Sequence, residues 1–432
     1  MKLARFHTKS VERSPNSGRA LDVIPRCATI AIILLIGLTC SLGVQGREER
    51  RDQATGRIRI LYVGDPVPGS PNPVFLRDPI TDVVPIIASG FNFPASDIRR
   101  YMRLYMPRTF NRLHENFDVI IISDAGIAFF TDKQLNWFKD GVEEQGMALI
   151  MIGGFEAFGG NIGLGSWGPT PIQDVLPVEC LADQWEDKEG KLTVAERDDP
   201  LMKSLPFDEI GAYGIFYGCN IVQMKQGSTT LATYNVVGSN RRHILLSYWD
   251  LGKGSSFAMT ADWTPAGGVD FLRWQYYGDY SLNVVTYIVG GKLPEDPTLV
   301  YQARQLIANF QDIRQTLDAV IEFASKFGGN MDAAEEMIGD AEDAKALAER
   351  SYIDAEIEDC IEQMRAAILV LEEASEKAYK LKDDALLWVY VTEWLVVSST
   401  GLICGFVLWT FMVRRRMYRE IGQTRLSRLD SQ

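Results

Sequence analysis

Short apolar runs alternate with amphipathic stretches between residues 57 and 293. The runs at 117–123 and 147–152 are almost continuously apolar, which is the pattern of parallel strands that are buried on both faces. The run at 57–63 is followed directly by Gly64, a residue that often marks the end of a strand. We therefore predict three strands of a buried sheet in the first half of this region.

The segment 131–145 has the periodicity of a helix, and it lies between two of these strands. Leu135, Phe138 and Val142 fall on one helical face, and Thr131 is a favourable N-cap residue. A strand, a helix and a second buried strand in this order are typical of a parallel sheet with helices on both faces. The predicted fold class is α/β.

The rest of this region gives weaker patterns. The proline-rich stretch 66–79 is predicted to be a loop, and 80–88 fits a helix or a strand equally well. Segments 242–248 and 255–260 are predicted to pair antiparallel through a glycine-containing turn. A helix is predicted over 271–290, with apolar positions in register at Leu272, Tyr276, Tyr280, Val284 and Tyr287.

The pattern changes at Asp296, where apolar residues begin to recur at spacings of three and four. The first helical stretch ends at Gly328, the second covers 331–350, and the third begins near Ile357. Such heptad-like stripes are typical of helices that pack against one another as a coiled coil or a bundle. We predict that residues 296–385 form a helical hairpin or a three-helix stalk.

The third helical stretch continues into 20 uncharged residues, from Trp394 to Val413, and three arginines follow at once. At about 1.5 Å per residue this length matches the hydrocarbon core of a bilayer. Arginines that flank such a span mark the cytoplasmic side. We predict a single transmembrane helix over 388–413 and a basic cytoplasmic tail over 414–432.

The amino-terminal residues 1–46 have a basic flank followed by an apolar run at 27–44, which is the pattern of an export signal. Val44-Gln45-Gly46 is a passable cleavage site, but the run is long enough to remain as a signal anchor. Both alternatives stay open. In either case residues 47–385 are predicted to lie outside the cytoplasm, and the protein crosses the cell membrane once or twice.

Charge and composition exclude several classes of function. The net charge of −13 argues against nucleic acid as a partner. Residues 296–384 contain 21 acidic and 9 basic residues, so the predicted stalk carries nearly all of the excess negative charge. The simplest interpretation of these charges is a solvated surface. The three histidines are isolated and there is no Cys-x-x-Cys motif. We therefore expect no metal site and no cofactor.

Two stretches and one dipeptide support a family resemblance. Residues 152–159 read Ile-Gly-Gly-Phe-Glu-Ala-Phe-Gly, residues 170–178 read Thr-Pro-Ile-Gln-Asp-Val-Leu-Pro-Val, and Asp262-Trp263 follows later. This order resembles the glutamine amidotransferase-like domain of prokaryotic membrane proteins, a relative of the class I glutamine amidotransferases, over residues 57–293. The resemblance implies a flavodoxin-like, three-layer α/β sandwich.

The catalytic pattern of the class I enzymes is missing. They attack the glutamine amide with a cysteine on a Gly-x-Cys-x-Gly turn, and a histidine of a His-x-Glu motif activates the thiol. The matching turn here is Gly153-Gly154-Phe155-Glu156-Ala157, which places Phe155 where the nucleophile would be, and no His-x-Glu occurs. The resemblance thus implies the fold without the activity, and we assign no catalytic residue.

The two thiols of the predicted α/β domain are Cys180 and Cys219. Neither follows the strand–turn–helix pattern with flanking glycines that activates a nucleophile, so neither is expected to be catalytic. A disulfide between them is permitted outside the cytoplasm. The alternative is that both are buried free thiols.

Residues at the predicted carboxyl ends of strands are the candidates for ligand binding, because open α/β sheets bind ligands at that edge. They are Asp65, Asp124, Phe155, Glu156, Asp262 and Trp263. The alternative is that the carboxylates cap helices and bind loop amides, while the aromatic residues cover the sheet.

The leading hypothesis is a membrane-anchored, extracytoplasmic protein whose degenerate amidotransferase-like domain binds a ligand or another envelope protein. The first alternative is a membrane-tethered, cysteine-dependent hydrolase or amidotransferase with a rearranged site. The second is a purely structural scaffold that self-associates through its helical stalk. The expected partners are the lipid bilayer, another envelope protein or a second copy, and no nucleic acid.

Overall fold

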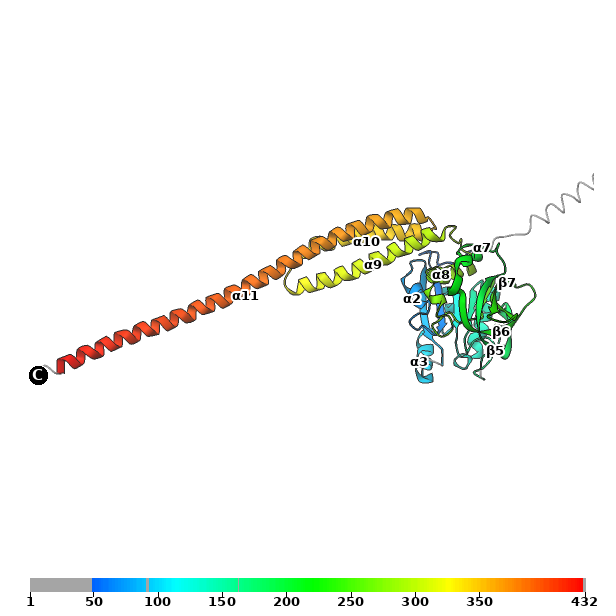
Figure 1. Ribbon diagram of the computed structural model, residues 1–432, viewed down its shortest axis with the longest axis horizontal. Coiled ribbons are helices and arrows are strands. Elements are labelled where there is room, and N and C mark those ends of the chain that lie inside the picture. Colours follow the sequence, from blue (N-terminus) through cyan, green and yellow to red (C-terminus); the bar gives the residue numbers. More distant parts are fainter. Residues whose placement is uncertain (1–48, 91–92, 162, 430–432) are drawn as a thin grey trace, which may run out of the picture. The chain divides into compact units, whose positions relative to one another are not determined.

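The computed structural model describes residues 49–90, 93–161 and 163–429 (Figure 1). The segment from residue 49 to residue 432 forms one compact unit. The predicted signal segment 1–46 lies outside the described residues. The strands of the described part are β1 (Ile58–Gly64), β2 (Thr81–Ile87), β3 (Val119–Ser123), β4 (Ala148–Ile152), β5 (Val178–Val194), β6 (Ile215–Met224), β7 (Thr229–Val236), β8 (Arg242–Leu251) and β9 (Gly254–Met259).

These strands form one mixed sheet in the order β2-β1-β3-β4-β9-β8-β7-β5-β6. Strands β2, β1, β3, β4 and β9 run parallel to one another. The remaining four strands extend the sheet with antiparallel pairing. The carboxyl ends of the five parallel strands therefore meet at one edge of the sheet.

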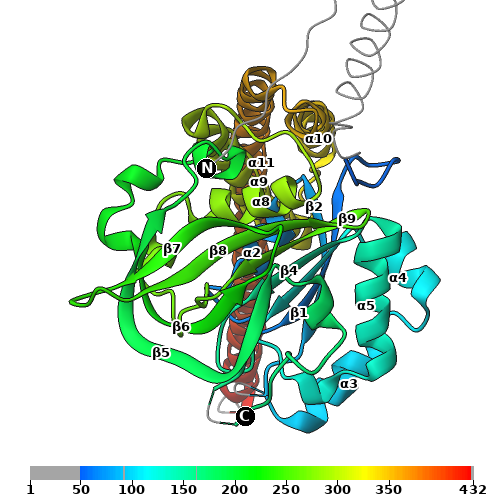
Figure 2. The ribbon, with the colours of Figure 1, turned by 90° about the vertical axis from the view of Figure 1, so that its right-hand side faces the viewer.

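Helices cover both faces of the parallel half, as predicted (Figure 2). One face carries α3 (Ala95–Tyr105), α4 (Phe110–Asn116), α5 (Asp132–Gln145) and α6 (Ile172–Val175), and the other carries α2 (Asn72–Arg77), α7 (Pro200–Lys203) and α8 (Tyr277–Ile288). Short 3-10 turns complete the domain as η1 (Ile127–Phe129), η2 (Phe207–Glu209), η3 (Gly211–Gly214) and η4 (Phe271–Arg273).

The patterned segments fold as predicted. Strands β1, β3 and β4 are present, and β8 and β9 form the expected antiparallel hairpin. Helix α5 begins after Thr131, whose hydroxyl accepts from the Gln134 amide while the Gln134 side chain accepts from the Thr131 amide. This capping box satisfies two amides that would otherwise lack partners.

Three segments differ from their prediction or resolve it. Residues 80–88 contain a strand, β2, because Thr81–Ile87 pairs in parallel with β1. The loop prediction for 66–79 was wrong in part, since Pro71 and Pro73 start the short helix α2. The helix predicted over 271–290 begins only at Tyr277, because the turn η4 precedes it.

The antiparallel half was not predicted strand by strand. Strand β5 has 17 residues, and its register against β6 shifts twice, so its alternation of apolar and polar residues is broken. Strand β6 also contacts the parallel half of the sheet just after β9, where the backbone amide of Asn220 donates to the Thr260 carbonyl at 2.9 Å. This contact brings β5 and β6 beside the loop that follows β4.

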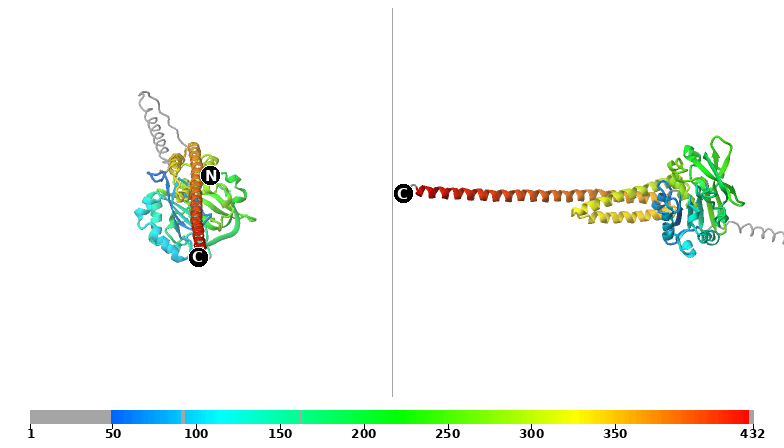
Figure 3. Two further views of the ribbon diagram at one scale, coloured as in Figure 1. Left: turned by 90° about the vertical axis from the view of Figure 1, so that its left-hand side faces the viewer. Right: turned by 90° about the horizontal axis from the view of Figure 1, so that it is seen from below.

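Three long helices follow the α/β domain (Figure 3). They are α9 (Pro297–Lys326), α10 (Asp332–Ile353) and α11 (Ile357–Leu429), and we call the part from 297 to 385 the stalk. Apolar residues of all three helices, among them Phe310, Ala341 and Met364, belong to the same buried cluster as the α8 face of the domain. The core is thus continuous from the sheet into the stalk.

Helix α11 is the one helix of the described residues that is long and apolar enough to cross a membrane. It continues without a break from the stalk into the apolar segment, as the absence of glycine and proline before Thr400 predicts. The large apolar side chains of that segment are exposed, with 77% of Trp394 and 63% of Phe406 accessible. Exposed apolar surface of this extent favours a lipid environment.

Candidate functional site

The loop after β4 is the segment that the resemblance matches to the nucleophile turn. Gly154 has a φ of +152°, and a Cβ atom on it would lie 2.2 Å from Cγ of Asp124. A Cβ atom on Gly153 would lie 2.0 Å from the Thr260 carbonyl oxygen. Two adjacent glycines are therefore required, because the backbone of this loop passes directly against β9 and Asp124.

Asn220, which the sequence analysis missed, fixes this loop from β6. Its side-chain oxygen accepts from the Gly154 amide at 3.0 Å, and its side-chain nitrogen donates to the Ala157 carbonyl at 3.1 Å. Asn220 is fully buried. The sequence offers no signal for this role beyond the residue type. An asparagine side chain can bind one donor and one acceptor of a turn, but only tertiary folding brings Asn220 to this loop.

Phe155 stands where the resemblance places the nucleophile. Its ring packs against the Trp185 ring, with centroids 5.3 Å apart. Among the described residues no helix begins between the end of β4 and Ile172. A nucleophile turn presents its reactive atom on a sharp strand-to-helix turn. This loop has neither the reactive atom nor the following helix.

The four predicted carboxylates come together at the carboxyl edge of the parallel strands. We call Asp65, Asp124, Glu156 and Asp262 the carboxylate cluster. They follow β1, β3, β4 and β9, and their charges act on one another. This placement agrees with the sequence prediction that the four side chains share one edge of the sheet.

Loop amides and hydroxyls bind most of these carboxylates. Asp124 accepts from the Glu156 amide at 2.7 Å, and Glu156 accepts from the Gly90 amide at 2.7 Å. Asp262 accepts from the Thr264 amide at 2.8 Å and from its hydroxyl at 2.7 Å. The described residues contain no group of His, Cys, Asp and Glu side chains that could hold a metal ion. The cluster thus organises the loops at this edge.

Burial dominates the electrostatics of the cluster. It raises the pKa of Asp262 from 3.8 to about 6, and the charge of Asp65 adds to this, while the two hydrogen bonds from Thr264 oppose it. Burial also raises the pKa of Asp124 well above its usual value, helped by the charge of Asp262. Neighbouring carboxyls in a dry site take up protons more easily because charged forms are poorly solvated there.

Trp263 belongs to the core and lies outside the cluster. Its side chain is fully buried, and its indole N–H donates to the Ser123 hydroxyl at 2.9 Å. The Tyr277 hydroxyl donates to the Trp263 carbonyl at 2.9 Å. Of the six candidates, four carboxylates are gathered, Phe155 packs on Trp185, and Trp263 covers the sheet.

Residues 100–290 match the model of a protein family described as "Putative glutamine amidotransferase". This chain contains a glutamine amidotransferase-like domain. The match lies inside the range 57–293 that the sequence motifs indicate, and it includes the loop of Gly153 and Phe155.

Solved structures give weaker likenesses, and a comparison with curated proteins found no match. The cytoplasmic protein STM1381 from Salmonella typhimurium LT2 is 22% identical, with a TM-score of 0.43 over 54% of this chain and 99% of that chain. The cytoplasmic protein STM3548 from Salmonella typhimurium is 20% identical, with a TM-score of 0.44 over 54% and 99%. A cold-adapted β-galactosidase from Rahnella sp. R3 is 12% identical, with a TM-score of 0.30 over 63% and 36%. Such likenesses carry no functional information.

The thiols of the amidotransferase-like domain are free cysteines, so the disulfide considered between Cys180 and Cys219 is absent. On the paired strands Cys180 lies opposite Val222, three residues along β6 from Cys219. Three residues of a strand span about 10 Å, which is beyond the reach of a disulfide. The two side chains also pack into clusters on opposite faces of the sheet.

Neither thiol is activated. Burial raises the pKa of Cys180 to about 12. Burial also raises the pKa of Cys219, and the charge of Glu186, which lies opposite it on β5, raises it further. His243 contacts Glu186 at 3.2 Å, and Arg241 contacts it at 2.7 Å. The charge that acts on Cys219 is thus that of a carboxylate, which disfavours a thiolate.

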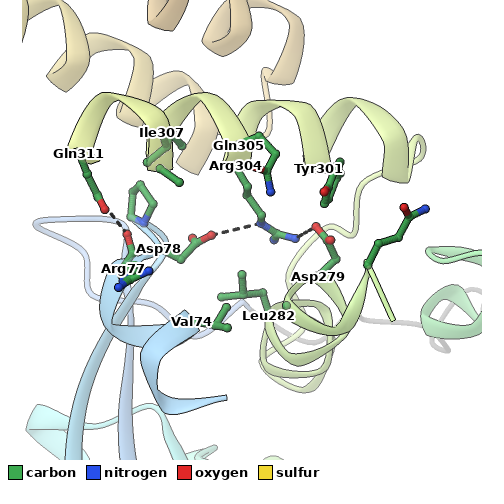
Figure 4. A pocket seen from close by; sticks show the side chains of 14 residues that line it. Val74, Arg77, Asp78, Asp279, Leu282, Tyr301, Arg304, Gln305, Ile307 and Gln311 are labelled. Atoms are coloured by element: carbon green, nitrogen blue, oxygen red, sulfur yellow. Dashed lines mark hydrogen bonds and ion pairs between the residues drawn. The ribbon is translucent and has the colours of Figure 1, made fainter. Parts of the chain in front are cut away.

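The amidotransferase-like domain has a second polar site where it meets the stalk (Figure 4). Arg304 of α9 points between Asp78, which precedes β2, and Asp279 of α8. Its Nε lies 3.2 Å from Asp78, and its Nη1 is paired with Asp279. The Tyr352 hydroxyl of α10 donates to Asp78 at 3.1 Å. Both carboxylates are 5% exposed, so this network joins the domain to two stalk helices away from water.

A cavity of 220 Å³, which we call the junction cavity, lies beside this network. Val74, Leu282 and Ile307 give it apolar walls, while Tyr301, Gln305 and Arg304 supply polar groups (Figure 4). Apolar walls with a few polar groups are typical of sites for small ligands. A molecule bound here would touch both the domain and the stalk.

Proposed function

We propose that this chain is a membrane-anchored, extracytoplasmic binding protein whose amidotransferase-like domain has no catalytic activity. The observation that carries the proposal is the Phe155 ring, packed on Trp185, at the place of the nucleophile. The missing helix after the loop and the unactivated thiols support it. The parallel strands follow the order 2-1-3-4 and then β9, which is the flavodoxin-like order expected of a class I amidotransferase-like sandwich.

The membrane anchor is the apolar part of α11. Its large exposed side chains, the preceding Trp388 and Tyr390, and the arginines from residue 414 support a single span over 388–413 with a cytoplasmic tail. The amidotransferase-like domain would then lie outside the cytoplasm, on its stalk. Alkaline extraction of membranes tests the anchor, because an integral protein stays in the pellet and a peripheral one is released.

The rival function is a cysteine-dependent hydrolase with a rearranged site. One observation favours it: Cys219, Glu186 and His243 lie together on strands beside the loop of Phe155. Against it, Cys219 is fully buried and its neighbour is the carboxylate. A purely structural scaffold is the remaining alternative.

We expect no glutaminase turnover from the purified full chain, and no labelling of Cys219 by iodoacetamide at pH 7 within an hour. The reason is that a buried, protonated thiol is a poor nucleophile. Mass spectrometry of labelled peptides measures the reaction, with the same chain unfolded in urea as the reference for full labelling. Turnover that the variant Cys219→Ser abolishes would establish the rival enzyme.

For the binding role, we expect a small polar molecule to enter the junction cavity and raise the melting temperature of the chain. Ligands that bind only the folded state stabilise it by mass action. The variant Ala308→Trp fills the mouth of the cavity from the exposed side of α9, and it should lose the response. A thermal-shift screen measures the melting temperatures of the wild type and of the variant with each molecule. A hit that stabilises the variant equally would place the ligand elsewhere.

A further inference from the structure

A groove of 960 Å³ lies between α3, η1 and the first turns of α5, and it shares no residue with the carboxylate cluster or the junction cavity. We call it the basic groove. Four cationic side chains line it, and they are Arg99, Arg103, Arg108 and Lys133. All four are exposed, and none forms an ion pair with a carboxylate of the described residues.

The basic groove is unusual in a chain with a net charge of −13. Residues 95–112 hold five arginines and a single acidic residue, Asp97. The Arg103 side chain donates to the Arg99 carbonyl at 3.1 Å, and the Lys133 ammonium lies 5.1 Å from the centre of the Trp137 ring. Arg99 and Arg103 are therefore held together, and no ion pair with a described carboxylate offsets the four cations that line the groove. Such a surface attracts an acidic partner.

Apolar residues form the floor of the basic groove. Met102 and Met106 are buried beneath the arginines, and Trp137 and Phe129 are partly exposed beside them. Arginine, methionine and aromatic residues are the types enriched at protein–protein interfaces. This combination fits an acidic protein surface that carries an apolar side chain.

The stalk carries a surface of that kind. Glu336, Asp340, Asp343 and Leu347 follow one another on α10 at spacings of four, three and four residues, so they share one face of the helix. We call them the acidic stripe. All four are exposed, Leu347 at 61%, and none of the three acids forms an ion pair with a described residue. The opposite face of α10, with Ala334, Ile338 and Ala341, is buried in the stalk.

We propose that the basic groove of one copy binds the acidic stripe of a second copy. The two patches differ, so the contact is heterologous, and successive copies would form a ring or a row. Exposed ion pairs contribute only about 0.2–1 kcal/mol each. Burial of the Leu347 side chain therefore has to add to the stability of the contact. The confinement of copies in one membrane, which raises their effective concentration, also favours it. This confinement rests on the membrane anchor proposed above.

Energy transfer between donor-labelled and acceptor-labelled full chains in phosphatidylcholine liposomes tests the contact. We expect transfer in 0.15 M NaCl and its loss in 1 M NaCl, because the screening length falls from about 8 Å to about 3 Å. Flotation of the same liposomes reports the anchor separately. Chains that float without energy transfer would overturn the contact and leave the anchor intact.

Charge reversal identifies the two surfaces. The variants R103E/R108E and D340K/D343K should each weaken self-association by about tenfold or more, since unlike charges become like charges. Mixing the two variants should restore transfer, because the intact groove of one meets the intact stripe of the other. The controls are R112E, on α4 outside the groove, and E372K/E376K, on α11.

Circular dichroism melting checks that each variant is folded. Transfer that both groove and stripe reversals leave unchanged would overturn the proposal. A wild-type chain that gives no energy transfer but binds a poly-glutamate peptide through the basic groove would also overturn the proposal, since the partner would then be another acidic protein.

Discussion

Replacing Arg304 with methionine should lower the free energy of unfolding by about 3–5 kcal/mol, which is typical when one partner of a buried ion pair is removed. Asp78 and Asp279 would remain in a dry junction without their shared cation. Burial already raises the pKa of Asp279 despite the charge of Arg304. Urea unfolding of the full chain in detergent, followed by tryptophan fluorescence, measures the loss.

A matched control is Arg314→Met on the same helix. Arg314 pairs with Asp318 and Glu342, which are 58% and 40% exposed, so its loss should cost less than about 1 kcal/mol. The triple variant R304M/D78N/D279N should recover most of the loss, because no buried charge is left unpaired. A cost for Arg304→Met no larger than that for Arg314→Met would show that this network does not join the domain to the stalk.

The second large effect is a gain of stability in Asp262→Asn at neutral pH. The pKa of Asp262 rises on folding from 3.8 to about 6, so the folded state holds its proton more tightly than the unfolded state. Below pH 3.8 the carboxyl is protonated in both states and costs nothing. As the pH rises from about 4 to about 6, ionisation favours unfolding, and the full cost of about 3 kcal/mol is present above pH 6.

Asparagine has no charge to bury, and its oxygen can still accept from the Thr264 amide. We therefore expect Asp262→Asn to be more stable than the wild type at pH 7.5 by up to about 3 kcal/mol, and about equally stable at pH 4. Urea unfolding at the two pH values measures the difference. Asp312→Asn, on the exposed face of α9, should change neither value. A gain for Asp262→Asn that is the same at both pH values would rule out burial of the charge as its cause.

Local patterns in the sequence were sufficient for β1, β3 and β4 and for the stalk helices, but they left the segment of β2 open between a helix and a strand. A strand that is buried on both faces must be apolar throughout, and β3 and β4 are. Thr131, the N-cap of α5, lies next to the helix that it starts, and α11 contains no glycine or proline before Gly401. Phe155, at the position that the resemblance assigns to the nucleophile, is likewise readable from the motif around it.

The antiparallel half could not be predicted in this way. Strand β5 shifts register twice against β6, and each shift moves the following side chains relative to their partners. The disulfide hypothesis depended on this register. With the two thiols on different rungs and opposite faces, spacing along the chain gave no basis for choosing between a disulfide and free thiols.

By itself the sequence determined the strands β1, β3 and β4, the helix α5 and the stalk helices, the apolar character of 394–413, and the absence of a thiol at position 155. The tertiary structure decided which distant side chains meet. Asn220 holds a loop 66 residues away, and Arg304 pairs with Asp78 across 226 residues. Periodicity reports only whether a position faces the core, whereas the partner of a buried polar group is set by how whole elements pack.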